Sequence, residues 1–172
     1  CVKHVPDASA ERAFAADLTV DREATDGLLS ELDEYAVEQA LRVAEEGDDV
    51  EVVALTVGPE DATAALKRAL QMGVGAGVHV LDDALHGTDV LGTSTVLAAA
   101  VTKAGADLVV CGMASTDGAM GVLPAMLAER LGWPAATYAG HLEVADGHAT
   151  IMREDDTARL TVEVDLPAVV SV

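Results

Sequence analysis

A glycine-rich stretch at residues 111–121, CGMASTDGAMG, combines residue types that can hold an anion. It follows the apolar run DLVV and precedes the helical pattern VLPAMLAERLGW. Glycines at 112, 118 and 121 let the backbone approach a ligand closely. A helix starting near Ala119 would direct its unpaired N–H groups and the positive end of its dipole toward that ligand. We therefore predict a phosphate site here. An ordinary glycine-rich turn with Asp117 as the helix N-cap is the alternative.

The stretch lacks the spacing of the familiar nucleotide motifs. It matches neither GxGxxG nor GxxxxGK[ST], and no Lys or Arg occurs from Ala104 through Glu129. A phosphate would therefore be held by backbone N–H groups, by the hydroxyls of Ser115 and Thr116, and by the helix dipole. This suits a bound monophosphate better than a triphosphate undergoing transfer, which needs cations around it.

Other residue types that could do chemistry are scattered along the chain. The five histidines fall in separate predicted elements, without the spacing of metal ligands. The two cysteines, Cys1 and Cys111, form no CxxC pair, which favours a reducing compartment and a packing role for Cys111. No Ser-His-Asp or Cys-His arrangement can be argued. We predict no metal site and no catalytic residue.

Strands and helices alternate through the first 134 residues. Short apolar runs at 1–5, 51–57, 77–81 and 107–111 predict strands. Helical periodicity predicts helices at 33–46, 59–72, 89–104 and 119–131. The pattern predicts an α/β fold, with a parallel sheet that carries helices on both faces. A small strand is expected at 17–23, on an excursion between the first strand and the first helix.

The pattern changes after residue 134. Two alternating runs flank Asp146-Gly147, a dipeptide typical of tight hairpin turns. The run RLTVEV at 159–164 alternates with period two, and PAVVSV follows at 167–172. An antiparallel extension near the C-terminus is therefore expected to follow the parallel core.

Length and charge limit the classes of function. The 172 residues are 51% hydrophobic, which suits one α/β domain over residues 1–172. Both ends fall inside apolar runs, so we expect the domain to be truncated at each. The formal net charge of −20 argues against nucleic acid or anionic membranes as partners. No apolar run approaches the roughly 20 residues of a membrane span, and no leader pattern is visible. A cytoplasmic location is expected.

Six pieces of the sequence resemble, in order, the β subunit of electron-transfer flavoprotein. They are VKHVPD, LTVDREATDGLLSELDEYAVEQAL, LTVGPEDATAALKRALQMG, GMASTDG, LGWP, and RED followed by LPAVVSV. The resemblance covers essentially the whole chain and implies an adenine-nucleotide-binding, Rossmann-like layout. It also implies an electron carrier rather than a self-sufficient enzyme.

The resemblance implies a heterodimer. An α subunit would hold most of the FAD, and this chain would bury one AMP. The complex would carry electrons from acyl-CoA and related dehydrogenases to a quinone oxidoreductase. The implied cofactor-binding residues are Cys1, Leu32, Asp33, Val57, Gly112, Met113, Ala114, Ser115, Thr116, Asp117, Gly118, Ala119, Met120, Gly121, Val122 and Leu123, with Leu32 also approaching the flavin and 119–123 cradling the phosphate.

The sequence departs from the family pattern at several of these positions. Met113-Ala114 stands where the family often has Lys-Gln, and residues 119–122 stand where it often has Asp-Thr-Gly-Gln. Backbone contacts are therefore expected to dominate the site, which either AMP or a second flavin could fill. A stress-type protein that binds an adenine nucleotide alone is the alternative function. A hydrolase of the same layout lacks the cations or metal ligands it would need.

Overall fold

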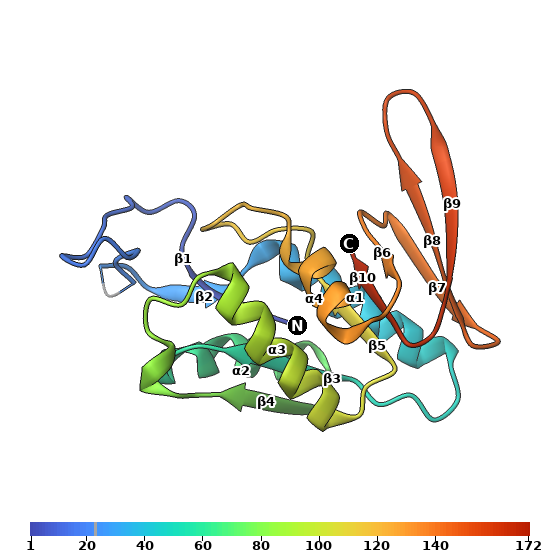
Figure 1. Ribbon diagram of the computed structural model, residues 1–172, viewed down its shortest axis with the longest axis horizontal. Coiled ribbons are helices and arrows are strands. Elements are labelled where there is room, and N and C mark those ends of the chain that lie inside the picture. The colour runs from blue at the N-terminus through green and yellow to red at the C-terminus, as the bar shows by residue number, and fades with distance from the viewer. Residues whose placement is uncertain (23) are drawn as a thin grey trace.

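The computed structural model describes residues 1–22 and 24–172, and parallel strands form its centre (Figure 1). Strand β3 (Val53–Val57) pairs with β4 (Ala76–Val80). Strand β10 (Ala168–Ser171) lies between β5 (Leu108–Cys111) and β6 (Ala135–Ala136) and is parallel to both. The predicted parallel α/β sheet is confirmed, although the last of these strands comes from the end of the sequence.

Residues 1–3 join the two groups of parallel strands. The backbone N–H of Val2 donates to the carbonyl oxygen of Leu55 in β3, at 2.9 Å. The backbone nitrogen of Cys1 donates to the carbonyl oxygen of Val110 in β5, at 2.6 Å. The N-terminal segment therefore lies between β3 and β5 and continues the sheet from one to the other.

An excursion separates the first strand from the first helix. Strand β1 (His4–Pro6) pairs antiparallel with β2 (Gly27–Leu29). The strand predicted at 17–23 is wrong over its described part, where Val20 makes only an isolated bridge with Phe14. Glu23 lies outside the described residues. Two short polar turns interrupt this segment, where side chains of Asp7 and Asp17 accept backbone N–H groups in place of a ladder.

The helices follow the predicted periodicity, except that the last one begins later than predicted. They are α1 (Glu31–Glu46), the 3₁₀ turn η1 (Glu60–Ala62), α2 (Thr63–Met72), the 3₁₀ turn η2 (Asp83–Leu85), α3 (Val90–Ala104) and α4 (Leu123–Leu131). Helix α3 illustrates how the local sequence sets the bounds. The carboxylate of Asp89 accepts the N–H of Gly92 at 2.9 Å, and Gly105 ends the helix in the left-handed conformation.

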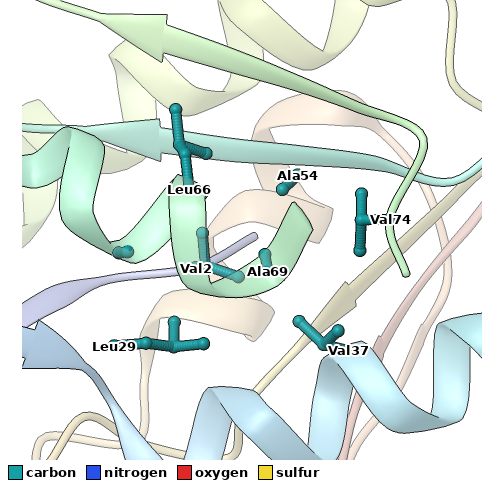
Figure 2. Packing of buried hydrophobic residues seen from close by; sticks show 8 residues of the cluster. Val2, Leu29, Val37, Ala54, Leu66, Ala69 and Val74 are labelled. Atoms are coloured by element: carbon teal, nitrogen blue, oxygen red, sulfur yellow. The ribbon is translucent and has the colours of Figure 1, made fainter. Parts of the chain in front are cut away.

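The helices cover both faces of the sheet, as predicted. Figure 2 shows the core under α1 and α2, where Val37 and Leu66 pack with Val2 from the N-terminal segment. Helices α3 and α4 cover the other face, with Leu97 and Leu127 in a second core that includes Cys111. The division follows from the strand period, since successive strand residues point to opposite faces.

The predicted antiparallel extension is confirmed for three strands. Strands β7 (His141–Ala145), β8 (His148–Glu154) and β9 (Arg159–Asp165) form one sheet. Asp146 and Gly147 both have positive φ, at 51° and 82°, as a two-residue hairpin turn requires. Figure 1 shows this sheet at the opposite end of the molecule from the excursion. Among the residues described, no helix is long and apolar enough to cross a membrane.

Leu127 provides a test of the second core. Its side chain is fully buried between α4 and the sheet. We expect Leu127→Ala to lower the free energy of unfolding by about 2–5 kcal/mol, because the lost methyl groups leave a cavity. Leu91→Ala on α3, where the leucine is 56% exposed, is the control and should change it little. Urea denaturation measures both, and equal losses would contradict the assigned core.

Candidate functional site

The start of α1 and the end of β5 meet at the carboxyl edge of the sheet. A Cβ atom added to Gly112 would lie 2.5 Å from Oδ1 of Asp33 and 3.0 Å from the carbonyl oxygen of Leu32. Three of the predicted site residues, Leu32, Asp33 and Gly112, are therefore in contact. Only glycine permits so close an approach at position 112.

Asp33 is a buried carboxylate whose partners are backbone N–H groups. Its Oδ2 accepts the N–H of Lys3 at 2.8 Å, and its Oδ1 accepts the N–H of Gly112 at 3.2 Å. Burial raises the pKa of Asp33 to about 6, although the amino group of Cys1 and the two backbone hydrogen bonds act in the opposite direction. Asp33 therefore ties the N-terminal segment to the first residue of the glycine-rich loop.

Asp117 forms a second tie to the same loop. Its carboxylate accepts Nζ of Lys3 at 2.8 Å and Nη2 of Arg22 at 2.7 Å, and its side chain is only 4% exposed. Burial raises the pKa of Asp117, but hydrogen bonds from Lys3, Ser115 and Arg22 outweigh that effect and hold it well below its usual range. The alternative role predicted for Asp117, as a helix N-cap, is wrong because the carboxylate is committed to these cations.

The helix after the loop begins later than predicted. Helix α4 starts at Leu123, not near Ala119, and Val122 is its N-cap. Ala119 and Gly121 have positive φ, at 50° and 65°, so they cannot belong to a right-handed helix. The N–H of Ala119 donates instead to the carbonyl oxygen of Ser115 at 2.9 Å. Gly121 thus lies in the loop rather than in the first helical turn.

The later start still leaves donors for an anion. Within residues 1–22 and 24–172, no acceptor is found for the backbone N–H groups of Gly121, Val122 and Leu123. The hydroxyl of Thr116 is buried and also lacks a partner among these residues. Since free backbone N–H groups before a helix attract anions, this short run fits a phosphate.

Apolar side chains surround these donors. Met113, Met120 and Val122 are exposed, and the N–H of Met113 donates to the carbonyl oxygen of Val172 at 2.7 Å. A Cβ atom at Gly121 would lie 3.3 Å from the hydroxyl of Tyr138. The loop therefore offers both polar backbone groups and apolar surface, as a nucleotide or flavin site requires.

The remaining predicted residues divide into two groups. Cys1, Val57 and Leu123 pack against the core that includes Cys111. Ala114 and Gly118 belong to the loop itself, and the N–H of Gly118 donates to Oδ1 of Asp117 at 2.7 Å. The structure therefore brings Leu32 and Asp33 to the loop, and it places Val57 at the end of β3.

Three basic residues that no sequence pattern indicated also meet the loop. Lys3 and Arg22 bind Asp117, and Nη2 of Arg12 donates to the carbonyl oxygen of Thr116 at 2.6 Å. The absence of cations between 104 and 129 concealed them, because all three lie about a hundred residues away in the sequence. Their occurrence around the excursion, in a chain with only ten basic residues, is the one available signal. In the part of the chain that the structure describes, no group of His, Cys, Asp and Glu could hold a metal.

The fold and this loop define a class of protein. A parallel sheet covered on both faces, with a glycine-rich loop at a strand's carboxyl end, is the architecture of nucleotide-binding α/β proteins. Comparison then identifies the family. The family model of the electron transfer flavoprotein domain matches residues 17–172, and the chain belongs to that family.

Within the family, the chain is similar to β subunits. It is 46% identical to the electron transfer flavoprotein subunit beta of Mycobacterium leprae, over 99% of this chain and 66% of the relative. It is 31% identical to the caffeyl-CoA reductase-Etf complex subunit CarD of Acetobacterium woodii and 30% identical to the acryloyl-CoA reductase electron transfer subunit gamma of Anaerotignum propionicum, over 99% of this chain in each case and over 66% and 65% of those proteins. The chain thus spans about two thirds of their length.

Removing the charge of Asp117 tests the second tie. We expect Asp117→Asn to lower the free energy of unfolding by about 2 kcal/mol, since hydrogen bonds to two cations lose their charged acceptor. Thermal and urea unfolding at pH 7 measure the change. Asp17→Asn is the matched control, because Asp17 binds His86 on the exposed surface and should matter little. An effect of Asp117→Asn no larger than that of the control would contradict the tie.

Proposed function

We propose that this chain is the β subunit of an electron-transfer flavoprotein that works as a heterodimer. The complex carries electrons from acyl-CoA and related dehydrogenases to a quinone oxidoreductase of the respiratory chain, in the cytoplasm. An α subunit holds most of the FAD, and this chain binds AMP. The family match supports the electron-transfer role, and the names of the relatives support a partnership with other subunits.

The observation that carries the AMP proposal is the geometry of residues 112–123. Among the described residues, the N–H groups of 121–123, at and just before the start of α4, have no acceptor, and the buried Thr116 hydroxyl lies in the same loop. These donors fit a phosphate group. Lys3 and Arg22 offset the charge of Asp117, so the loop does not repel an anion through that carboxylate. We assign the cofactor contacts to Cys1, Leu32, Val57 and residues 112–123, and we assign to Asp33 the support of Gly112 at the start of the loop.

FAD supplies the redox chemistry when it is bound in the complex. This chain contributes exposed apolar side chains beside the loop, including Met113, Met120 and Tyr138. Such side chains can exclude water from a neighbouring ring system. A stress-type protein that binds an adenine nucleotide alone is not favoured, because the family model covers most of the chain.

The direct experiment identifies what the protein retains on purification. The full chain is purified with any subunit that accompanies it, and released ligands are identified by mass spectrometry. We expect about one AMP per chain and FAD on the accompanying subunit. A second FAD in place of AMP, or no nucleotide at all, would contradict the AMP assignment.

Glycine at 121 is expected to matter more for AMP than the hydroxyl of Ser115. In Gly121→Val, the valine is strained at this positive φ by on the order of 1–3 kcal/mol, and its side chain crowds the Tyr138 hydroxyl. The backbone N–H groups of the next residues are displaced as a result. Loss of the Ser115 hydroxyl costs about 1 kcal/mol. AMP retained after gel filtration measures both effects.

A matched control separates strain from binding. Gly132 ends α4 at φ 68° and has no neighbouring atom within 4 Å of an added Cβ. Gly132→Val should therefore lower stability but retain AMP. If Gly121→Val keeps its AMP while Ser115→Ala loses it, side-chain contacts rather than backbone N–H groups hold the ligand.

The chain alone is expected to bind little FAD. It lacks a dinucleotide-binding glycine motif, and in our proposal the α subunit supplies most of the contacts. Flavin absorbance after gel filtration of this chain with excess FAD measures binding, and the reconstituted heterodimer is the positive control. A stoichiometric yellow complex of this chain alone would contradict the division of roles.

A further inference from the structure

Both oxygens of the Asp33 carboxylate are taken by the main chain. The two donors, the N–H groups of Lys3 and Gly112, are 30 and 79 residues away in the sequence. Asp33 is 7% exposed, so little of it can reach a ligand. These contacts place Asp33 between the N-terminal segment and the glycine-rich loop.

Asp33 fixes the position of Gly112, the residue at which the glycine-rich loop begins. Oδ1 of Asp33 occupies the space into which any side chain at Gly112 would project, only 2.5 Å from where a Cβ atom would lie. The N–H of the next residue, Met113, donates to Val172, so the first two loop residues are both fixed by hydrogen bonds. A change in the acceptor at Asp33 is therefore transmitted to the loop backbone.

We propose that Asp33 is a positioning residue whose ionised carboxylate holds the glycine-rich loop in its nucleotide-binding conformation, and whose protonation releases one backbone N–H and weakens nucleotide binding. The inference rests on the proposed binding of AMP by this loop. It gives Asp33 a role through Gly112 rather than a direct contact with the ligand. A protonated carboxyl group has one oxygen that donates, so it cannot accept from both N–H groups equally well.

The surroundings of Asp33 put its titration near neutral pH. Burial raises its pKa to about 6, against the opposing effect of the Cys1 amino group, the two backbone hydrogen bonds and the charge of Lys3. The thiol of Cys111 also faces it, and burial raises the pKa of that thiol further above neutrality. On α1, Glu34 is engaged by Arg68 and Glu31 is exposed. Lys3 is itself paired with Asp117.

The sign of the effect separates binding from stability. Because folding raises the pKa of Asp33, its protonation favours the folded state, and its contribution to stability is lost as the pH rises through about 6. Lowering the pH from 7 to 5 should therefore weaken AMP binding without a loss of stability from this group. If Asp33 only supported the fold, AMP binding and stability would not respond in opposite ways as the pH falls.

AMP affinity as a function of pH tests the inference. Isothermal titration of the full chain, with any accompanying subunit, is performed between pH 5 and 8 on the wild type, Asp33→Asn and the control Glu38→Gln. Glu38 lies on the exposed side of α1, paired with Arg42. We expect wild-type and control affinities to fall about tenfold more than that of Asp33→Asn between pH 7 and 5, as loss of one charge-assisted hydrogen bond implies. Titration of the AMP phosphate is common to all three proteins and cancels in the comparison.

A second measurement needs no variant. The amide resonance of Gly112 in ligand-free wild-type protein should shift with a midpoint near pH 6. If Asp33→Asn does not fold, absence of this shift overturns the inference and its presence supports it. An equal pH dependence of AMP affinity in wild type and Asp33→Asn would overturn the inference and leave the proposed function intact. Failure to bind AMP at every pH would overturn both.

Discussion

The backbone of residues 1–3 connects the parts of this molecule. Its hydrogen bonds to Leu55 and Val110 join β3 to β5, and the carbonyl oxygen of Lys3 accepts the N–H of Ser30 just before α1. The N–H of Lys3 is bound by Asp33, and its side chain by Asp117. Because one short segment makes all these contacts, the same three residues hold the sheet, the first helix and the glycine-rich loop in place relative to one another.

Charged groups of both signs meet at the site, so it is not a patch of positive charge alone. A chain with a net charge of −20 places three of its ten basic side chains around three loop residues, 115–117. They satisfy Asp117 and the carbonyl oxygen of Thr116, so the loop backbone is fixed before any ligand arrives. Preorganisation of this kind reduces the ordering that a ligand must otherwise impose.

Most elements could be predicted from the sequence because local periodicity and caps determine them. Helix α3 and the turn at Asp146-Gly147 are good examples, since each depends on neighbouring residues. The predicted start of α4 was wrong because positive φ at Ala119, a residue that usually avoids it, has no local signal. The partners of Asp117 could not be predicted, because Lys3 and Arg22 are about a hundred residues away. Distant pairings depend on topology, which no local pattern records.

The position of β10 has a consequence for the order in which the fold can form. This strand lies between β5 and β6, although both precede it in the sequence. β5 and β6 cannot be joined within the sheet until residues 168–171 have been synthesised and have returned from the β7–β9 sheet. Loop closure over about sixty residues must therefore precede the gain in hydrogen bonds, which is characteristic of folds that form slowly. Until then the carboxyl end of β5, where the loop begins, lacks the strand that pairs with it on one side.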